Sequence, residues 1–366
     1  MRVIIAGGGT AGHINPGIAV AKLIKQKDKN ADILFIGTRR GLETKLVPRE
    51  GFDLRLIKVR GFKRKLSLDT FIAVKELFQG LLEARRIIKE FKPDVVIGTG
   101  GYVCGPVLFN ACRMKIPTLI HEQNAFPGVT NRILSRIVDA VAISFKESGQ
   151  YFKYAKKLVY TGNPVRMEII QADRQASREK LGIRPNDTFV VIFGGSLGAE
   201  RINETVVEML KKYSMDCKIL FGTGNAQYES IAKELEGVRS SSVLVVPYIY
   251  DMGSAMAAAD LVICRAGAIT CSELTALGVP SIMIPSPNVV ANHQEHNARS
   301  LEKNGASIII LERDLSGDIL YEQMVRLLKD KEQLNKMAKN AKKIGITNAV
   351  DKIYSIIDEL VKGRAG

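Results

Sequence analysis

The stretch VIIAGGGTAGH, residues 3–13, is an apolar run followed by four glycines in six positions and then a histidine. A short Val/Ile run predicts a buried strand, and the glycines predict a tight turn into a helix. Gly7, Gly9 and Gly12 match G-x-G-x-x-G, a turn that brings backbone N–H groups close to a dinucleotide or another phosphate. Strand, glycine turn and helix in this order predict an α/β fold with a parallel sheet.

The same order recurs along the chain. Further apolar runs that end in glycine or polar turns occupy residues 33–38, 95–101 and 117–124, and a second series begins near residue 188 and continues at 217–224, 242–249, 259–268 and 280–287. Because 366 residues exceed what one hydrophobic core usually supports, we expect two doubly wound, Rossmann-like domains that face each other across a cleft.

The domain boundaries follow from the two series of strand, turn and helix. We expect a first domain over residues 1–163 and a second over residues 164–344, with a more polar linker region near residues 161–187. The last stretch is an amphipathic helix, and the sequence leaves open whether this helix, at about residues 345–366, packs back onto the first domain.

The charge is distributed unevenly. Residues 1–163 contain 28 Lys and Arg against 13 Asp and Glu, whereas the rest of the chain contains 25 of each, so the whole excess of +15 lies in the first half. This asymmetry indicates an anionic partner for the first half, either nucleic acid, an acidic lipid surface or a phosphorylated substrate. Aromatic residues make up only 6% and do not alternate with basic ones, which disfavours nucleic acid.

Cysteine usage and hydropathy exclude several classes. The five cysteines are scattered and lack CxxC spacing, so neither a disulfide framework nor a zinc site is indicated, and a reducing compartment fits best. No apolar run approaches the roughly 20 residues of a spanning helix, and the first apolar segment is too short for a secretory signal. We therefore expect neither export nor a membrane span.

His13 distinguishes the first loop from an ordinary cofactor loop. The positive end of a helix dipole disfavours imidazolium and leaves a neutral ring that can accept a proton, as a general base must. A histidine that merely caps the helix is the alternative, and this position alone does not decide. The second strand is followed by Thr38, Arg39 and Arg40 instead of the acid that holds an NAD ribose, so an NADP-dependent oxidoreductase remains an alternative.

Three more loops follow predicted strands: GTGGYVCGP (98–106), HEQNAFPG (121–128) and FGGSLGA (193–199). Ligands of open α/β sheets bind at the carboxyl ends of the strands, so the first two loops should lie beside GGGTAGH. There, the N–H groups of GGGTAGH and GTGGYVCGP could together hold a diphosphate. Asn124 can hydrogen-bond a sugar or phosphate, or serve as a turn residue, and the Ser196 hydroxyl adds a donor in the second half.

The segment CRAGAITCSELTALGVPSIMIPSP (264–287) predicts a tight turn into a helix that carries Glu273. A carboxylate there suits two vicinal ribose hydroxyls, although it could be ordinary charge near a helix N-terminus. The following loop adds polar side chains that can read sugar hydroxyls, namely Asn292, His293, Gln294 and His296. No D-x-D triplet occurs, so we expect a site without a metal ion or another cofactor.

A basic cluster precedes an apolar run in residues 61–92. Lys63, Arg64 and Lys65 are followed by a helical pattern whose apolar face, which includes Phe71, Leu77 and Phe78, is too broad for one core stripe. Cations beside exposed Leu and Phe are typical of proteins that bind an anionic bilayer surface. A crossover helix buried in the domain is the alternative.

Taken together, GGGTAGH, GTGGYVCGP, HEQNAFPG, GNPVR (162–166), FGGSLGA, CRAGAITCSE and NHQ (292–294) resemble the MurG family of bacterial glycosyltransferases, in order and over nearly the whole chain. The resemblance implies a GT-B architecture. It implies inverting transfer of N-acetylglucosamine (GlcNAc) from UDP-GlcNAc to the C4 hydroxyl of N-acetylmuramoyl-pentapeptide on undecaprenyl diphosphate, which converts lipid I to lipid II. The resemblance therefore implies a role in peptidoglycan synthesis, and through it in cell shape and cell division.

The resemblance also implies a location and a set of site residues. It implies a peripheral protein on the cytoplasmic face of the bacterial membrane, with other cell-wall synthesis proteins as partners. His13 corresponds to the general base, and Tyr102 lies on the acceptor side. The residues implied for the donor are Ile249 at uracil, Glu273 at ribose, Arg166 and Ser196 at the diphosphate and Gln294 at the sugar, together with Thr10, Ala11, Gly12, Asn124, Ala268, Ile269, Thr270, Cys271 and Ser272.

Three positions depart from the family pattern. Ala11 stands where many members have glycine, Ala266 where serine is common, and His293 where some members have a second glutamine. The competing hypotheses are a related GT-B enzyme with another lipid acceptor such as a diacylglycerol, the NADP-dependent oxidoreductase, and a non-catalytic module that binds a nucleotide sugar at the membrane.

Overall fold

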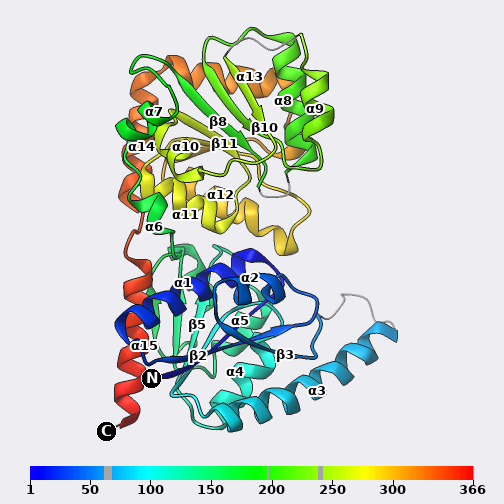
Figure 1. Ribbon diagram of the computed structural model, residues 1–366, viewed down its shortest axis with the longest axis vertical. Helices are drawn as coiled ribbons and strands as arrows, with labels where there is room; N and C mark the ends of the chain where they lie inside the picture. The colour runs from blue at the N-terminus through cyan, green and yellow to red at the C-terminus, as the bar shows by residue number, and fades with distance from the viewer. Residues whose placement is uncertain (62–67, 196–197, 238–241, 366) are drawn as a thin grey trace. The chain divides into compact units, whose positions relative to one another are not determined.

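The computed structural model describes residues 1–61, 68–195, 198–237 and 242–365. The chain forms two compact units (Figure 1). The first unit consists of residues 1–164 and 348–366, and the second consists of residues 165–347. Each unit has its own sheet and its own hydrophobic core.

The first unit is built on a seven-stranded sheet with the order β3-β2-β1-β4-β5-β6-β7, in which every pair is parallel. Both faces of this sheet are covered, because alternate residues of β1 enter different cores: Ile4 joins one cluster, and Val3 and Ile5 join the other. The strands are β1 Arg2–Gly7, β2 Asp32–Thr38, β3 Asp53–Ile57, β4 Val95–Gly100, β5 Thr118–Glu122, β6 Ala140–Ile143 and β7 Leu158–Tyr160.

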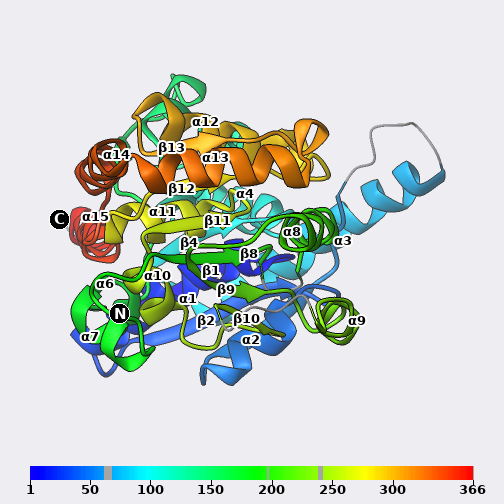
Figure 2. The ribbon, with the colours of Figure 1, turned by 90° about the horizontal axis from the view of Figure 1, so that it is seen from above.

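The helices of the first unit come from both of its chain segments. They are α1 Ala11–Lys27, α2 Glu43–Arg49, α3 Leu68–Phe91, α4 Cys104–Arg113, α5 Val129–Leu134, the 3-10 helix Lys146–Tyr151 and α15 Ala349–Ala365. Ile353, Ile356 and Ile357 of α15 are buried in the same cluster as Val3 and Ile5. The closing helix therefore completes the core of the first unit. In both ribbon views the N-terminal part of α3 extends beyond the sheet (Figures 1 and 2).

The second unit has a six-stranded parallel sheet with the order β10-β9-β8-β11-β12-β13. Its strands are β8 Phe189–Phe193, β9 Lys218–Gly222, β10 Val243–Val246, β11 Leu261–Cys264, β12 Ser281–Met283 and β13 Ser307–Ile309. Its helices are α6 Met167–Ile170, α7 Arg174–Lys180, α8 Glu200–Lys212, α9 Tyr228–Glu234, α10 Met252–Ala258, α11 Ala268–Leu277, α12 His293–Lys303, α13 Gly317–Lys329 and α14 Lys331–Ile344, with 3-10 helices at Val290–Asn292 and Glu312–Asp314.

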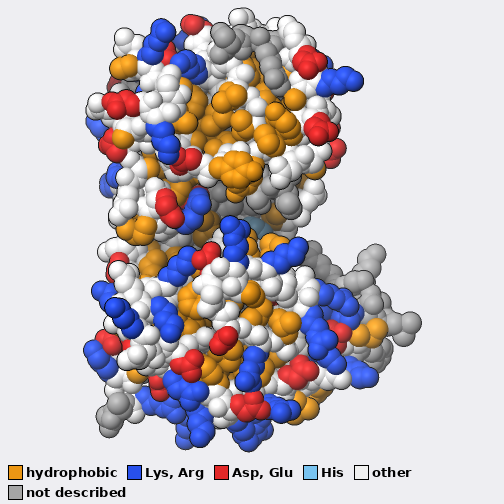
Figure 3. All heavy atoms as spheres, viewed as in Figure 1, with side chains coloured by type: hydrophobic (Ala, Val, Ile, Leu, Met, Phe, Trp, Pro, Cys, Tyr) orange, Lys and Arg blue, Asp and Glu red, His pale blue; other side chains and the backbone are white. Residues whose placement is uncertain are grey.

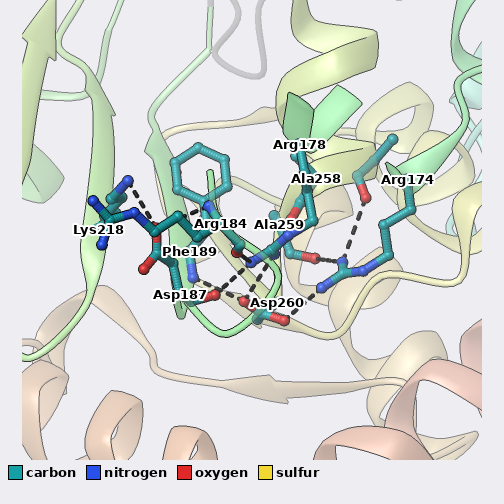
Figure 4. Close-up of polar contacts among 10 residues, drawn as sticks. Arg174, Arg178, Arg184, Asp187, Phe189, Lys218, Ala258, Ala259 and Asp260 are labelled. Carbon is teal, nitrogen blue, oxygen red and sulfur yellow. Dashed lines mark hydrogen bonds and ion pairs between the residues drawn. The ribbon is translucent and has the colours of Figure 1, made fainter. Parts of the chain in front are cut away.

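The expected linker near residues 161–187 is wrong, because most of this segment is an integral part of the second unit. Its helix α7 packs on α10, and two arginines of α7 bind the turn before β11 (Figure 4). Arg174 donates to the Ala259 carbonyl at 2.6 Å and to the Asp260 carboxylate at 2.6 Å, and Arg178 donates to the Ala258 carbonyl at 3.0 Å. The other Asp260 oxygen accepts from Phe189 N, the first residue of β8, at 2.8 Å.

Candidate functional site

The carboxyl ends of β1, β4 and β5 bring three of the expected loops together. These strands are neighbours, and the chain leaves β1 toward β2 on one side while β4 lies on the other, so the edge between β1 and β4 is a topological switch point. Gly8 N donates to the Gly100 carbonyl at 3.2 Å across this edge. A Cβ at Gly101, whose φ is +86°, would lie 2.5 Å from the Gly8 carbonyl oxygen, so glycine permits the close approach of the two loops. The predicted proximity is confirmed.

His13 lies in the first turn of α1, which begins at Ala11 with Thr10 as its N-cap residue. Its ring is partly exposed and packs against Gly100, where any Cβ would collide with the imidazole. Nδ1 lies 3.0 Å from Oε1 of Gln123, the residue directly after β5. The turn therefore places the imidazole at the switch point with one nitrogen bound to the protein.

Gln123 and Glu43 are two residues of this site that the sequence reasoning missed. The Glu43 side chain is 0% exposed, and its carboxylate accepts hydrogen bonds from Gly9 N at 2.9 Å, Thr38 N at 2.7 Å and Thr38 Oγ1 at 2.9 Å. The only sequence signal for Glu43 was an acid shortly after the second strand, five residues beyond Thr38, where that strand ends.

These contacts correct the expectation that the GGGTAGH loop holds a diphosphate on its glycine N–H groups. Gly8 N is bound by the Gly100 carbonyl and Gly9 N by the Glu43 carboxylate. A phosphate bound here would lie close to the buried Glu43 carboxylate, and it could not accept hydrogen bonds from Gly8 N and Gly9 N, because both already have partners. The geometry disfavours a dinucleotide pyrophosphate here, and with it the oxidoreductase alternative.

A second buried acid organises the loop after β5. Glu122 accepts from Asn124 N at 3.0 Å, from Gly128 N at 3.1 Å and from Asn131 Nδ2 at 2.8 Å. Asn124, on the same loop, is half-buried. The buried Glu122 side chain thus fixes the loop that carries Asn124.

Tyr102 lies just after β4. It is 54% exposed, and its ring lies against Gly61.

In the second unit the loops after β8 and β9 approach each other closely. Gly198 has a φ of +80°, and a Cβ there would collide with the Thr223 carbonyl oxygen. Asn203, buried in α8, donates to the same carbonyl at 2.7 Å. The side chain of Ile249 is buried and packs against Gly222. These contacts fix the backbone around the carboxyl ends of both strands.

Arg166 and Glu273 form an ion pair in the second unit. Glu273 lies in α11 with its residue 6% exposed, and its Oε1 accepts from Arg166 Nη2 at 3.2 Å and from Nε at 3.3 Å. Burial raises the pKa of the Glu273 carboxyl, and the Arg166 guanidinium acts in the opposite direction. This contact joins positions 107 residues apart, so it leaves no signal in the sequence, where Arg166 and Glu273 are separate candidates.

The remaining predicted donor residues surround the start of α11 and α12. Gln294 Oε1 accepts from Ser286 N at 2.9 Å, and Asn297 of the same helix donates to the Ala266 carbonyl at 3.1 Å, which ties α12 to the turn before α11. Cys271 is buried with Sγ 3.9 Å from Met283 Sδ, so only its backbone can line a pocket. Partly buried side chains follow at Ala268, Ile269, Thr270 and Ser272.

Several predicted residues lie outside the described part of the chain. They are Ser196 and the basic cluster Lys63, Arg64 and Lys65; Phe71 lies in α3, but its side chain is not described. Further along α3, Leu77 is half-buried, while Phe78 is 65% and Leu82 71% exposed. The apolar face of α3 is thus partly open.

Within residues 1–61, 68–195, 198–237 and 242–365, no group of three or more His, Cys, Asp or Glu side chains is arranged to hold a metal ion. No helix there is both long and apolar enough to cross a membrane.

The comparisons with known proteins cover nearly the whole chain. The N-terminal domain of glycosyltransferase family 28 matches residues 3–143, and its C-terminal domain matches residues 189–353. A relative from Acetivibrio thermocellus is 65% identical over 100% of both chains, and one from Ruminiclostridium cellulolyticum is 57% identical over 99% of this chain and 100% of its own. Both are named UDP-N-acetylglucosamine–N-acetylmuramyl-(pentapeptide) pyrophosphoryl-undecaprenol N-acetylglucosamine transferase.

Solved structures agree with this result. The crystal structure of Acinetobacter baumannii MurG is similar, with a TM-score of 0.83 and 32% identity over 98% of this chain and 99% of that one. A UDP-GlcNAc 2-epimerase from Neisseria meningitidis, bound to UDP-GlcNAc, has a TM-score of 0.66 at 18% identity over 98% and 100% of the two chains, which shows a shared fold alone. These findings confirm the predicted family and fold: the chain belongs to glycosyltransferase family 28, with the MurG transferases as its group and GT-B as its fold.

Proposed function

We propose that this chain transfers GlcNAc from UDP-GlcNAc to the C4 hydroxyl of N-acetylmuramoyl-pentapeptide on undecaprenyl diphosphate, with inversion at the anomeric carbon. The full-length identity to transferases named for this donor and this acceptor supports the substrates. The observation that carries the mechanism is His13, held at the switch point of the first sheet with Nδ1 bound to Gln123.

His13 acts as the general base in this proposal. Its free ring nitrogen removes the proton of the acceptor hydroxyl while the hydroxyl oxygen attacks C1 of GlcNAc, and the bond from C1 to the UDP oxygen breaks. The proton ends on His13, and UDP leaves with the bonding electron pair. A direct displacement of this kind inverts the configuration at C1. Tyr102, exposed beside the same strand ends, is the proposed contact for the acceptor.

The second unit is the proposed donor domain. Glu273 holds the ribose hydroxyls, Arg166 and Ser196 the diphosphate, and the Ile249 backbone the uracil. The Arg166–Glu273 ion pair supports this division, since a bound diphosphate would compete for the half-exposed guanidinium and release the buried carboxylate to accept from ribose. Gln294 uses its oxygen for Ser286 N, which leaves its NH₂ group to donate to the sugar.

Other donor contacts stay proposals on the same grounds. The helix start at residues 268–273 lines the donor pocket, and Thr10, Ala11, Gly12 and Asn124 contribute from the first unit, where Thr10 is the N-cap residue of α1 and Ala11 and Gly12 are its first two residues. We expect transfer to proceed without a metal ion, because the D-x-D carboxylates that would hold one on the diphosphate are missing from the sequence.

A peripheral position on the anionic cytoplasmic face of the membrane completes the proposal. The open apolar face of α3 and the excess positive charge of the first half support it.

Product analysis tests the reaction directly. Purified protein with UDP-GlcNAc and a short-chain lipid I analogue should yield the disaccharide product with inverted linkage and equimolar UDP. His13→Ala should lower kcat by about 10² or more while UDP affinity, measured by calorimetry, stays unchanged. An unaltered rate would return His13 to a structural role.

The same assay separates the competing functions. Transfer to a diacylglycerol in preference to the lipid I analogue would favour the related lipid glycosyltransferase. Binding of UDP-GlcNAc without its consumption would favour a non-catalytic module.

A further inference from the structure

The side-chain amide of Gln123 has a fixed orientation. Gln123 is 2% exposed, and its Nε2 donates to the Thr99 carbonyl at 2.8 Å and to the His121 carbonyl at 3.0 Å. A reversed amide would place its carbonyl oxygen against these two carbonyl oxygens, where no hydrogen bond can form. Oε1 must therefore face His13 Nδ1, and because an amide oxygen only accepts, Nδ1 must carry a hydrogen.

His121 fixes the amide from the other side. Its Nε2 lies 3.1 Å from the Gly162 carbonyl, which only accepts, and 3.1 Å from Ser144 Oγ. The Ser144 hydroxyl donates its hydrogen to the Glu122 carbonyl and Asn163 Oδ1, so Nε2 carries the hydrogen of this ring.

Burial lowers the pKa of His121 from its usual 6.5 to about 4, so the ring is neutral near pH 7. Its Nδ1 is consequently an acceptor, and it lies 2.9 Å from Gln123 Nε2. The amide NH₂ group has two hydrogens: one is donated to the Thr99 carbonyl, and the other is shared between the His121 carbonyl and His121 Nδ1.

We infer that a hydrogen-bond chain of fixed polarity, from His13 through Gln123 and His121 to the Gly162 carbonyl, holds neutral His13 as the tautomer with its hydrogen on Nδ1. The lone pair of that ring is then on Nε2, the ring nitrogen that is not bound to Gln123. Gln123 and His121 are positioning residues, because they act on the reaction only through His13.

The chain also favours the product of the proton transfer. When Nε2 takes the hydroxyl proton, His13 becomes an imidazolium, and the hydrogen bond from Nδ1 to the Gln123 oxygen becomes charge-assisted and stronger. In the other tautomer Nε2 would carry a hydrogen and could not accept the proton, and Nδ1 and Oε1 would face each other without a hydrogen. This inference rests on the proposed role of His13 as the base, but the tautomer itself can be measured separately.

Nitrogen NMR of the full chain labelled with ¹⁵N-histidine measures the tautomer without any substrate. The chain has four histidines, so His13→Ala assigns the His13 signals by their loss. At a pH where His13 is neutral, we expect a protonated Nδ1 and a bare Nε2. A ring with its hydrogen on Nε2 overturns the inference.

Variants at Gln123 test the cause. Gln123→Met removes the acceptor at nearly constant length, and the His13 signals should then shift toward a mixture of tautomers. Gln123→Glu retains an oxygen facing Nδ1 in either protonation state, and the tautomer with Nδ1–H should return. If the His13 nitrogen signals do not change in Gln123→Met, the hydrogen-bond chain does not set the tautomer.

Asn110→Leu is the matched control for lost stability. Asn110 is also buried in the first unit, and its Nδ2 also donates to two backbone carbonyls, those of Leu81 and Pro106, at 2.9 Å each. This variant should lose stability as Gln123→Met does but keep the His13 tautomer and kcat. An equal change of tautomer in Asn110→Leu would assign the effect to general loosening and overturn the inference.

Kinetics connect the tautomer to the reaction. Gln123→Met should lower kcat by about tenfold or more with little change in KM for UDP-GlcNAc, and Gln123→Glu should recover most of the rate. If His13→Ala retains full activity, the proposed base is wrong, whereas the NMR result still decides the tautomer. The two failures are therefore distinguishable.

Discussion

At the scale of single residues, burial of His121 couples folding to pH. The folded protein holds this imidazole neutral with its pKa lowered to about 4, whereas the unfolded chain binds a proton near 6.5. The unfolded state then binds more protons between these values, so stability is full above pH 6.5 and falls as the pH falls toward 4. The expected loss of unfolding free energy is about 3 kcal/mol.

Urea unfolding at several pH values between 7 and 4 measures this loss. His121→Gln should show a flatter dependence over this range, because the titrating group is gone. His296→Gln, which removes an exposed histidine instead, should retain the dependence of the original chain. Equal slopes in all three proteins would contradict the assignment to His121.

The residues of this site differ in how far the sequence alone predicts their roles. His13 could be placed correctly because a strand, a glycine turn and a helix are local features of adjacent residues. Gln123 and Glu43 could not, since their roles come from contacts with His13 and Gly9, which are 110 and 34 residues away. The expectation that the loop N–H groups could hold a diphosphate has the same cause, because the sequence does not show that Gly8 N and Gly9 N have partners within the protein.

At the scale of elements, most apolar strands were predicted, including β11 and β12 with four and three residues, whereas β3, β6, β7 and β13 were missed. The central strands β1, β4, β8 and β11 are Val/Ile-rich because helices cover both faces, and this composition is legible in the sequence. β3, with the sequence DLRLI, is largely exposed, and β7 and β13 are three residues each, too short for a periodic pattern. β6, AVAI, is buried but only four residues long.

The partly open face of α3 makes a prediction about membrane binding. The double variant Phe78→Ser/Leu82→Ser should weaken binding to vesicles that contain anionic lipid, because exposed apolar side chains enter the interface. Lys63, Arg64 and Lys65 replaced by Glu should also weaken binding and make the remainder less sensitive to salt.

Sedimentation with vesicles measures both effects. Leu244→Ser, which removes an exposed leucine from the second unit, is the control and should bind as the original chain does. Normal sedimentation of both the double and the triple variant with anionic vesicles would place the membrane contact elsewhere.

At the scale of the whole molecule, the charge belongs to one unit. Residues 348–366 join the first unit and add three basic and three acidic side chains, so the first unit keeps the excess of +15 and the second stays neutral. On the face in Figure 3, Lys and Arg side chains gather over the unit that contains β1 to β7. The unit that carries His13 is thus the one that an anionic surface or a lipid-linked diphosphate would attract.

The last helix, α15, packs in the core of the first unit, and this allows a prediction about stability. Ile357 of α15 is 0% exposed in the core that contains Val3 and Ile5, whereas the core of the second unit consists of other residues. Ile357→Ala should cost the first unit about 2–5 kcal/mol through lost burial and the cavity it leaves. Calorimetry should therefore show one transition moved to lower temperature and the other unmoved, and Ser355→Ala, on the exposed side of α15, should move neither. A shift of both transitions by the same amount would mean that the two units unfold together, and the last helix would then stabilise the molecule as one cooperative body.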